Sequence, residues 1–131
     1  MTGIQVKIIN NSENEIKSNN REIDRQKIEL ENLKKQEEFT SGEILRQKQL
    51  LIAFNGSAES REIEQKKLKN LEKEKKNIVR ETEATHEKVN ELEKEIKQLE
   101  KTIETNKTVT IRLKNEEIRI QNEQILQVEN L

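Results

Sequence analysis

Apolar side chains return every seven residues through the first half of this 131-residue chain. A seven-residue repeat that is sustained over several turns places its members along one side of an α-helix, and it is typical of a coiled-coil contact. We therefore predict one long helix in this half, with its apolar side in contact with another helix. The members of the row are Ile9, Ile16, Ile23, Leu30, Glu37, Ile44 and Leu51, of which only Glu37 is polar.

The second half of the chain carries a matching row. From Val89 to Ile103 the apolar residues are spaced three and four apart without a break. The positions before Val89 include Lys75, Thr82 and Thr85, so we expect the contact to be weaker there. The predicted seam between the two helices consists of Ile16, Ile23, Leu30, Ile44, Leu68, Leu71, Val89, Leu92, Ile96, Leu99 and Ile103.

A companion row in the first helix, three residues after the apolar row, is mostly polar. Its Asn and Gln side chains are open to two interpretations. Buried in the contact, they would fix the register and the number of helices at a cost in stability. Alternatively, the seam consists of the apolar row alone, and Ile28, Leu33, Leu45 and Leu50 widen the apolar stripe around it. We prefer this interpretation because it is simpler. The companion row consists of Asn19, Gln26, Leu33, Thr40, Gln47 and Phe54.

A chain reversal is predicted at Asn55-Gly56-Ser57. Glycine readily adopts the left-handed backbone conformation found at the residue after many helices, so Gly56 can end the first helix. Ser57 is a favourable N-cap for the next helix. Residues 40–43 (Thr-Ser-Gly-Glu) are a second candidate interruption. We prefer the first site because it supplies both a stop signal and a start signal.

The two helices on either side of this reversal have similar predicted lengths, so the chain can fold back on itself. In an antiparallel hairpin closed at residues 55–57, the numbers of facing residues add up to about 113, because both helices rise 1.5 Å per residue. The apolar positions fit this register, since Leu51 meets Ile63, Ile44 meets Leu68, Ile23 meets Val89 and Ile16 meets Leu99. The alternative is a parallel dimer or trimer of nearly continuous helices with a kink at Gly56.

Short strands are predicted before and after the helices. Ile4, Val6 and Ile8 alternate with polar residues, which is the spacing of a half-buried strand. Ser12 and Glu15 then have the spacing of a capping box, so the first helix is expected to begin near residue 12.

The C-terminal part alternates in the same way. Val109, Ile111 and Leu113 precede a polar stretch, and Ile118 and Ile120 follow it, which favours a β-hairpin. A continuing helix is the rival, because residues 111, 118 and 125 are all Ile and lie seven apart.

The predicted fold is mainly α, with a long antiparallel coiled-coil hairpin and a small β element formed by the two ends. The predicted segments are an N-terminal strand at 1–11, a first helix at 12–54, a turn at 55–57, a second helix at 58–106 and a C-terminal β-hairpin or tail at 107–131.

The composition argues against an enzyme. Charged residues make up 39% of the chain and hydrophobic ones 30%, against about 25% and roughly 45–50% in ordinary globular domains. Too little apolar volume remains to enclose a pocket. The chain has no Cys and a single histidine, His86, and no nucleotide-binding or nucleophile motif occurs. We expect no catalytic site, no bound metal and no cofactor.

The charges do not favour nucleic acid. Lys and Arg total 25 and Asp and Glu total 26, so the net charge is −1. The strongest basic cluster, residues 66–76, is interleaved with Glu72 and Glu74, and no aromatic residue there can stack on bases. No signal peptide or apolar run of about 18 residues is present, so we expect no membrane segment and a location in the cytoplasm or in a soluble assembly.

A run of apolar residues precedes the predicted turn: Leu50, Leu51, Ile52, Ala53 and Phe54. One narrow seam cannot cover this run. We prefer the interpretation that it caps the hairpin, internally or within an oligomer; alternatively, Leu50, Leu51, Ile52 and Phe54 are partner-binding residues at the tip of the hairpin.

We therefore expect a non-enzymatic, elongated structural, assembly or adaptor protein that acts through coiled-coil contacts with a protein partner, with further copies of itself, or with both. The alternatives are a small inhibitor or regulator of a macromolecular machine, such as phages encode, and a component of a phage or virion fibre or of its assembly.

Overall fold

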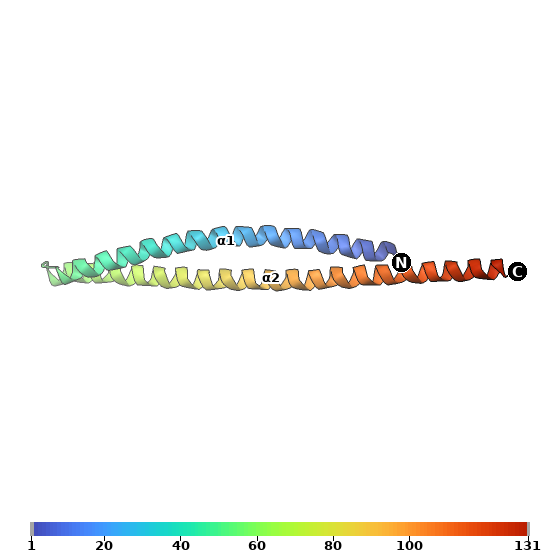
Figure 1. Cartoon of the computed structure of the whole chain (residues 1–131). Coiled ribbons are helices and arrows are strands. Elements are labelled where there is room, and N and C mark those ends of the chain that lie inside the picture. The colour runs from blue at the N-terminus through green and yellow to red at the C-terminus, as the bar shows by residue number, and fades with distance from the viewer. Residues whose placement is uncertain (1, 131) are drawn as a thin grey trace. The chain divides into compact units, whose positions relative to one another are not determined.

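The computed structural model describes residues 2–130, which form two α-helices. Helix α1 spans Thr2–Ile52, with 51 residues, and helix α2 spans Ala58–Glu129, with 72 residues. The chain reverses between them and the two helices pack against each other (Figure 1). The predicted helical hairpin is confirmed, and the chain does not continue as one kinked helix.

The predicted β element is wrong within the described residues. Residues 4–9 lie inside α1, residues 109–120 lie inside α2, and no strand occurs between residues 2 and 130. Met1 and Leu131, the outer ends of the two predicted β segments, lie outside the described residues. Side-chain hydrogen bonds account for part of the difference. The hydroxyl groups of Thr108 and Thr110 donate to the carbonyls four residues earlier, at 3.0 and 2.8 Å, so these β-branched polar residues are satisfied within a helix.

The predicted start of the first helix near residue 12 is also wrong. Ser12 lies in the interior of α1 and is buried, with 6% of its surface exposed. The helix extends to Thr2 because the stripe that contacts α2 continues through the half-buried residues Gln5, Ile8 and Ile9. A helix gains most of its stability from such packing rather than from its cap.

The chain divides into two units, each of which contains a part of both helices. The central unit is Ile23–Glu91, and the terminal unit consists of the described residues of Met1–Glu22 and Leu92–Leu131. Buried apolar side chains lie in the central unit: Ile23, Leu33, Ile44, Ile78 and Val89. In the terminal unit the contact residues of the two helices are half-buried, apart from Ser12.

Both rows of α1 face α2, so the interpretation of a seam one residue wide is wrong. Ile28 and Leu45, which were expected to widen a narrow seam, are 64% and 58% exposed, and Leu50 is exposed as well. Polar members of the companion row lie in the contact instead: Ser12 and Thr40 are buried, and Asn19, Gln26 and Gln47 are half-buried.

Hydrogen bonds between the helices fix the register within each unit. In the central unit, Gln47 Nε2 donates to the backbone oxygen of Glu64 at 2.9 Å and to Oε2 of the same residue at 2.6 Å. In the terminal unit, Asn19 Nδ2 donates to Glu95 Oε2 at 3.4 Å. Both pairs fit the predicted register, in which the numbers of facing residues add up to about 113.

In the central unit, this register places apolar residues opposite apolar ones and polar residues opposite polar ones. Position 33 of α1, a Leu, falls opposite Ile78, and position 26, a Gln, falls opposite Thr85. The acidic Glu37 falls opposite the basic Lys75. A shift by one heptad would set apolar residues against polar ones, so this pattern selects one register.

The turn between the helices comprises residues 53–57. Ser57 is the N-cap of α2, as predicted, since its Oγ accepts a hydrogen bond from the backbone N–H of Ser60 at 3.2 Å. The left-handed conformation expected for Gly56 is wrong, because no described glycine has a positive φ. A Cβ atom on Gly56 would instead lie 2.5 and 2.8 Å from two atoms of the Phe54 ring. A larger residue at position 56 would therefore displace that ring.

Candidate functional site

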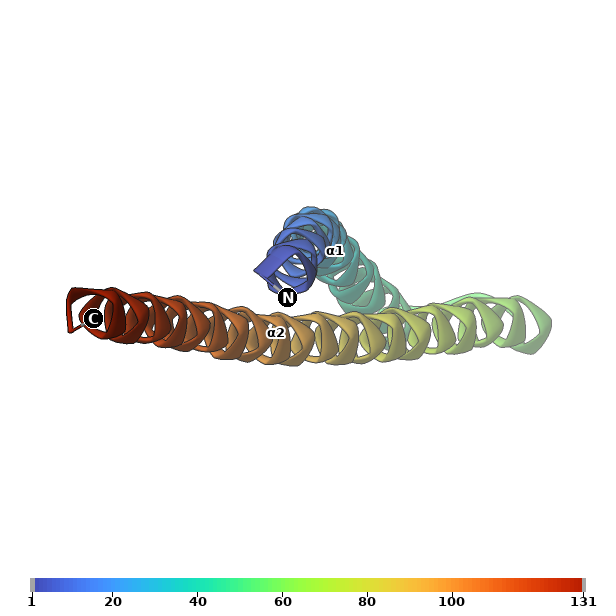
Figure 2. The same ribbon diagram turned by 90° about the vertical axis from the view of Figure 1, so that its right-hand side faces the viewer.

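Helix α2 continues past the start of α1 in the terminal unit (Figures 1 and 2). The register places the first residues of α1 opposite position 110 or so of α2. Every described residue from 114 to 130 is exposed. We call residues 114–129 the overhang, a stretch of single helix that begins directly after the half-buried Leu113.

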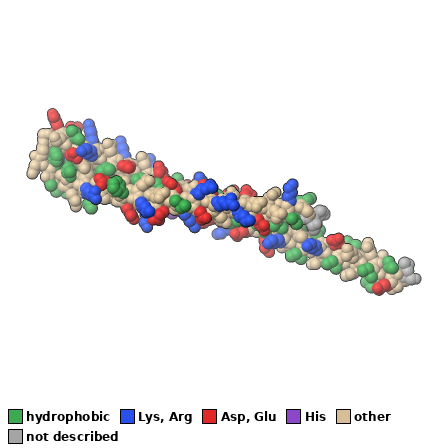
Figure 3. Space-filling model, turned by 90° about the horizontal axis from the view of Figure 1, so that it is seen from above, with side chains coloured by type: hydrophobic (Ala, Val, Ile, Leu, Met, Phe, Trp, Pro, Cys, Tyr) green, Lys and Arg blue, Asp and Glu red, His purple; other side chains and the backbone are tan. Residues whose placement is uncertain are grey.

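The overhang displays large apolar side chains to solvent, and Figure 3 shows hydrophobic side chains at the surface of this part of the helix. One open hollow lies on it, lined by Gln121, Gln124, Ile125, Val128 and Glu129. The exposed apolar side chains of the overhang are Ile118 (54%), Ile120 (43%), Ile125 (56%), Leu126 (57%) and Val128 (68%).

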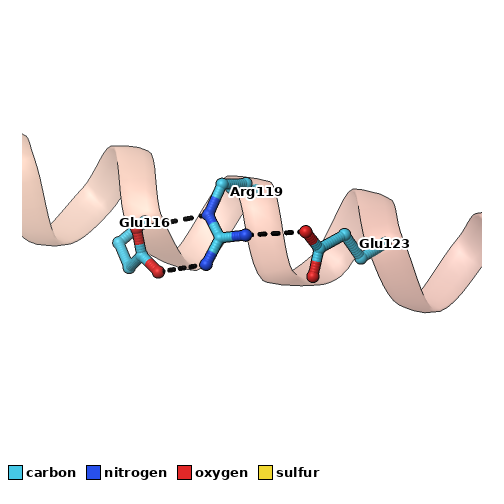
Figure 4. A network of polar contacts seen from close by, with 3 residues as sticks. All are labelled: Glu116, Arg119 and Glu123. Carbon is cyan, nitrogen blue, oxygen red and sulfur yellow. Dashed lines mark hydrogen bonds and ion pairs between the residues drawn. The ribbon is translucent and has the colours of Figure 1, made fainter.

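An ionic network occupies another face of the overhang (Figure 4). Arg119 Nε donates to Glu116 Oε2 at 3.3 Å, and Arg119 Nη1 donates to Glu123 Oε1 at 2.6 Å. The hydrogen bond from Arg119 holds the pKa of Glu116 below its ordinary value, and the same contact raises the pKa of Arg119. These three side chains join successive turns of a helix that lacks a neighbour at this level.

The predicted tip residues do not form a single exposed surface. Ile52 is 86% exposed and Leu50 is also exposed. Leu51 is half-buried, and its backbone oxygen accepts a hydrogen bond from Arg61 Nη1 at 3.5 Å. Phe54 is half-buried, with its ring close to Gly56.

One predicted contact at the tip is wrong. Ile63 was expected to meet Leu51, but it is exposed. The half-buried Glu64 occupies the contact position next to it, where its hydrogen bonds with Gln47 and then with Lys67 lower the pKa of its carboxyl group. Ile63 therefore adds an exposed apolar side chain to the start of α2 that the sequence analysis did not predict.

The predicted seam residues lie along the contact between the helices. Ile23, Ile44 and Val89 are buried. Leu33, which was predicted to widen the seam and was not among its main residues, is the most deeply buried side chain at 1% exposed. The remaining predicted seam residues are half-buried: Ile16, Leu30, Leu68, Leu71, Leu92, Ile96, Leu99 and Ile103.

Groups with potential for chemistry are dispersed. His86 is exposed and lies beside an open groove of the central unit with Thr82, Lys34 and Glu37. Among the described residues, no three His, Cys, Asp or Glu side chains are grouped so that they could hold a metal ion.

Neither α1 nor α2, over the residues described, contains a segment that is both long and apolar enough to cross a membrane.

Exposed apolar side chains also occur along α1, among them Ile4, Ile28 and Phe39. The overhang and the tip are the candidates for contacts with other proteins, because each carries neighbouring exposed apolar side chains. No family model, no curated protein and no solved structure matches this chain.

Proposed function

We propose that this chain is a non-enzymatic assembly or adaptor protein that acts through coiled-coil contacts with other protein chains, including further copies of itself, in the cytoplasm or within a soluble assembly. A structural component of a phage or virion fibre would be one protein of this class.

The observation that carries the proposal is the exposed overhang. A single helix of this length is marginally stable in water, and most helices in proteins are held by the packing of an apolar side. The overhang has apolar side chains for such packing, yet residues 114–129 are all exposed. Neighbouring exposed apolar side chains are typical of protein interaction surfaces. A helix from another chain would cover them.

The non-enzymatic part of the proposal rests on composition. Only 30% of the residues are hydrophobic, and the buried ones of the central unit lie along one seam between two helices. Enzyme sites are generally lined by apolar walls that exclude water from a few polar groups.

The proposal is tested by photocrosslinking in the cells that produce the protein. A photoreactive amino acid replaces Ile118 in one variant and Glu123, on the ionic face, in a matched control. We expect protein crosslinks from position 118 and far fewer from position 123. Absence of crosslinks to any protein chain, from position 118 and from position 52 at the tip, contradicts an assembly or adaptor role.

A second candidate is a small regulator that docks on a macromolecular machine by its tip. The exposure of Ile52, at 86%, together with that of Leu50 favours it. In the same experiment, crosslinks from position 52 to one other protein, with none from position 118, would support the regulator and contradict assembly through the overhang.

A further inference from the structure

We propose that two copies of this chain pair through their overhangs as a parallel, two-stranded coiled coil. This inference rests on the proposed function and names the partner as a second copy. The contact is made by six residues spaced three and four apart, five in the overhang and Ile111 just before it, which we call the pairing stripe: Ile111, Lys114, Ile118, Gln121, Ile125 and Val128.

The pairing stripe lies on one side of α2. Successive residues of an α-helix are about 100° apart, so residues spaced alternately by three and four stay on one side. The same geometry places Glu116, Arg119 and Glu123 on the opposite side, where their ion pairs remain in water (Figure 4). One side of the overhang is therefore ionic, and on the opposite side Ile118 and Ile125 continue the seven-residue spacing from Ile111. The exposed Ile120 and Leu126 lie beside the ionic residues, outside the stripe.

The stripe is separate from the contact with α1. Ile111 is 60% exposed, whereas Thr110 and Leu113 on the side towards α1 are half-buried. A second chain can therefore reach the stripe from its first residue without displacing α1.

The order of apolar and polar residues along the pairing stripe favours a parallel arrangement of the two overhangs. When two identical helices pair in parallel, each residue meets its own counterpart, so Ile118 meets Ile118 and Ile125 meets Ile125. In the antiparallel arrangement, the same stripe sets Ile118 against Gln121 and Ile125 against Lys114. Only the parallel arrangement joins every apolar residue of the pairing stripe with an apolar one.

The flanking charges are compatible with parallel pairing. In that geometry Glu117 of one copy lies near Asn122 of the other, and Gln124 lies near Glu129. None of these cross-pairs joins two like charges. The basic residues Arg112 and Arg119 lie away from the interface.

Two of the six positions in the pairing stripe are polar, and this limits the stability of the dimer. The Gln121 side chains can hydrogen-bond to each other, because an amide group both donates and accepts. The Lys114 side chains meet as like charges, so their stems pack while the ammonium groups reach solvent. Such polar positions specify partner and orientation at a cost in stability. We therefore expect a dimer that dissociates on dilution.

Single cysteine variants of the full chain test the orientation, since the natural sequence has no Cys. Under mild oxidation, Ile118→Cys forms a disulfide-linked dimer at least ten times faster than the control Glu123→Cys on the ionic side. A mixture of Ile111→Cys and Val128→Cys detects the antiparallel arrangement. A mixed disulfide that forms faster than the Ile118→Cys dimer overturns the parallel assignment.

Sedimentation equilibrium of the unmodified chain and of an Ile118→Lys/Ile125→Lys variant tests the interface itself. We expect the double substitution to raise the dissociation constant at least tenfold while the thermal unfolding of the hairpin is retained. Ile28→Lys, at an exposed position of α1, is the matched control and leaves the dissociation constant unchanged. A monomeric mass at every concentration overturns pairing with a second copy. If crosslinks from position 118 then reach another protein, the adaptor function stands without this inference.

Discussion

Leu33 shows how much one residue contributes to a hairpin with a single seam. Its side chain is 1% exposed, and the register places it opposite Ile78. Replacement by Ala removes buried apolar surface and leaves a space that two long helices cannot easily close.

We expect Leu33→Ala to lower the free energy of unfolding by about 2–4 kcal/mol, as measured by urea denaturation. The control Ile28→Ala removes a similar side chain that is 64% exposed, and it changes the same quantity by less than about 0.5 kcal/mol. An equal loss of unfolding free energy in the two variants would contradict the burial of Leu33 in the seam.

Gly56 allows a prediction whose sign depends on a neighbouring residue. A Cβ atom there would approach the Phe54 ring to 2.5 Å, so Gly56→Ala lowers the free energy of unfolding by about 1 kcal/mol as the ring is displaced. In a Phe54→Ala background the clash is absent and the φ of residue 56 is not positive. The same change then raises stability by about 0.5 kcal/mol, because Ala restricts the unfolded chain more than Gly does. Thermal unfolding of all four proteins measures the difference; equal effects in both backgrounds would show that the ring plays no part.

At the scale of the elements, the overhang is held by contacts within its own helix. The pKa of Glu116 in the folded protein lies below its ordinary value of 4.5, chiefly because of the hydrogen bond from Arg119. A carboxyl group with a lowered pKa stabilises the folded form above its ordinary pKa, and this contribution is lost as the pH falls through the lowered value.

We therefore expect the amide protection factors of residues 114–123 to fall when the pH is lowered from about 6 to about 3, as measured by hydrogen exchange with mass spectrometry. The variant Glu116→Gln starts with weaker protection and shows a smaller fall over the same range. An unchanged pH response in this variant would assign the effect to other groups.

The sequence predicted the contact between the helices better than their ends. The seven-residue spacing that includes Ile23, Ile44 and Val89 does not depend on local propensity, and these residues are buried. The N-cap at Ser57 was also predictable, because its hydroxyl accepts a hydrogen bond from a backbone N–H only three residues away in the sequence.

The strands were mispredicted because two signals competed in the same residues. Alternating Val, Ile and Thr at 108–113 favours a strand, whereas the spacing of Leu113 from Ile103 and of Ile118 from Ile111 continues a helix. Residues 108–113 are helical because the packing of Val109, Thr110 and Leu113 against α1 outweighs their β-propensity, and the hydroxyl groups of Thr108 and Thr110 are satisfied by the helix backbone. Residues 118–121 lie beyond α1, where ion pairs of Arg119 with Glu116 and Glu123 join successive turns of the helix.

The exposure of the tip was only partly predictable. Leu51 belongs to the seven-residue row and is half-buried, whereas Phe54 lies beyond the end of α1, so its burial depends on the conformation of the turn.

At the scale of the whole molecule, the turn is the only covalent link between α1 and α2. Residues 53–57 hold the two helices at a high effective concentration, so the hairpin forms without a second molecule.

We expect cleavage at a protease site inserted between Asn55 and Gly56 to make the melting temperature depend on protein concentration, since two separate chains must then associate. The measurement is thermal unfolding over a hundredfold range of concentration, before and after cleavage. The Ile118→Lys/Ile125→Lys background is used so that pairing of overhangs does not contribute. A melting temperature that stays independent of concentration after cleavage would mean that each helix is stable alone.

The uneven distribution of buried side chains has a consequence for how the hairpin comes apart. Leu33 and Ile78 lie in the central unit, whereas the terminal unit buries Ser12 and half-buries Asn19, whose polar groups lose little on meeting water. Breathing motions therefore start where α1 begins and become rarer towards the middle of the seam. Each such opening exposes the side of α2 towards α1 between Leu92 and Leu113. This gives an incoming helix a second apolar surface, apart from the one on the overhang.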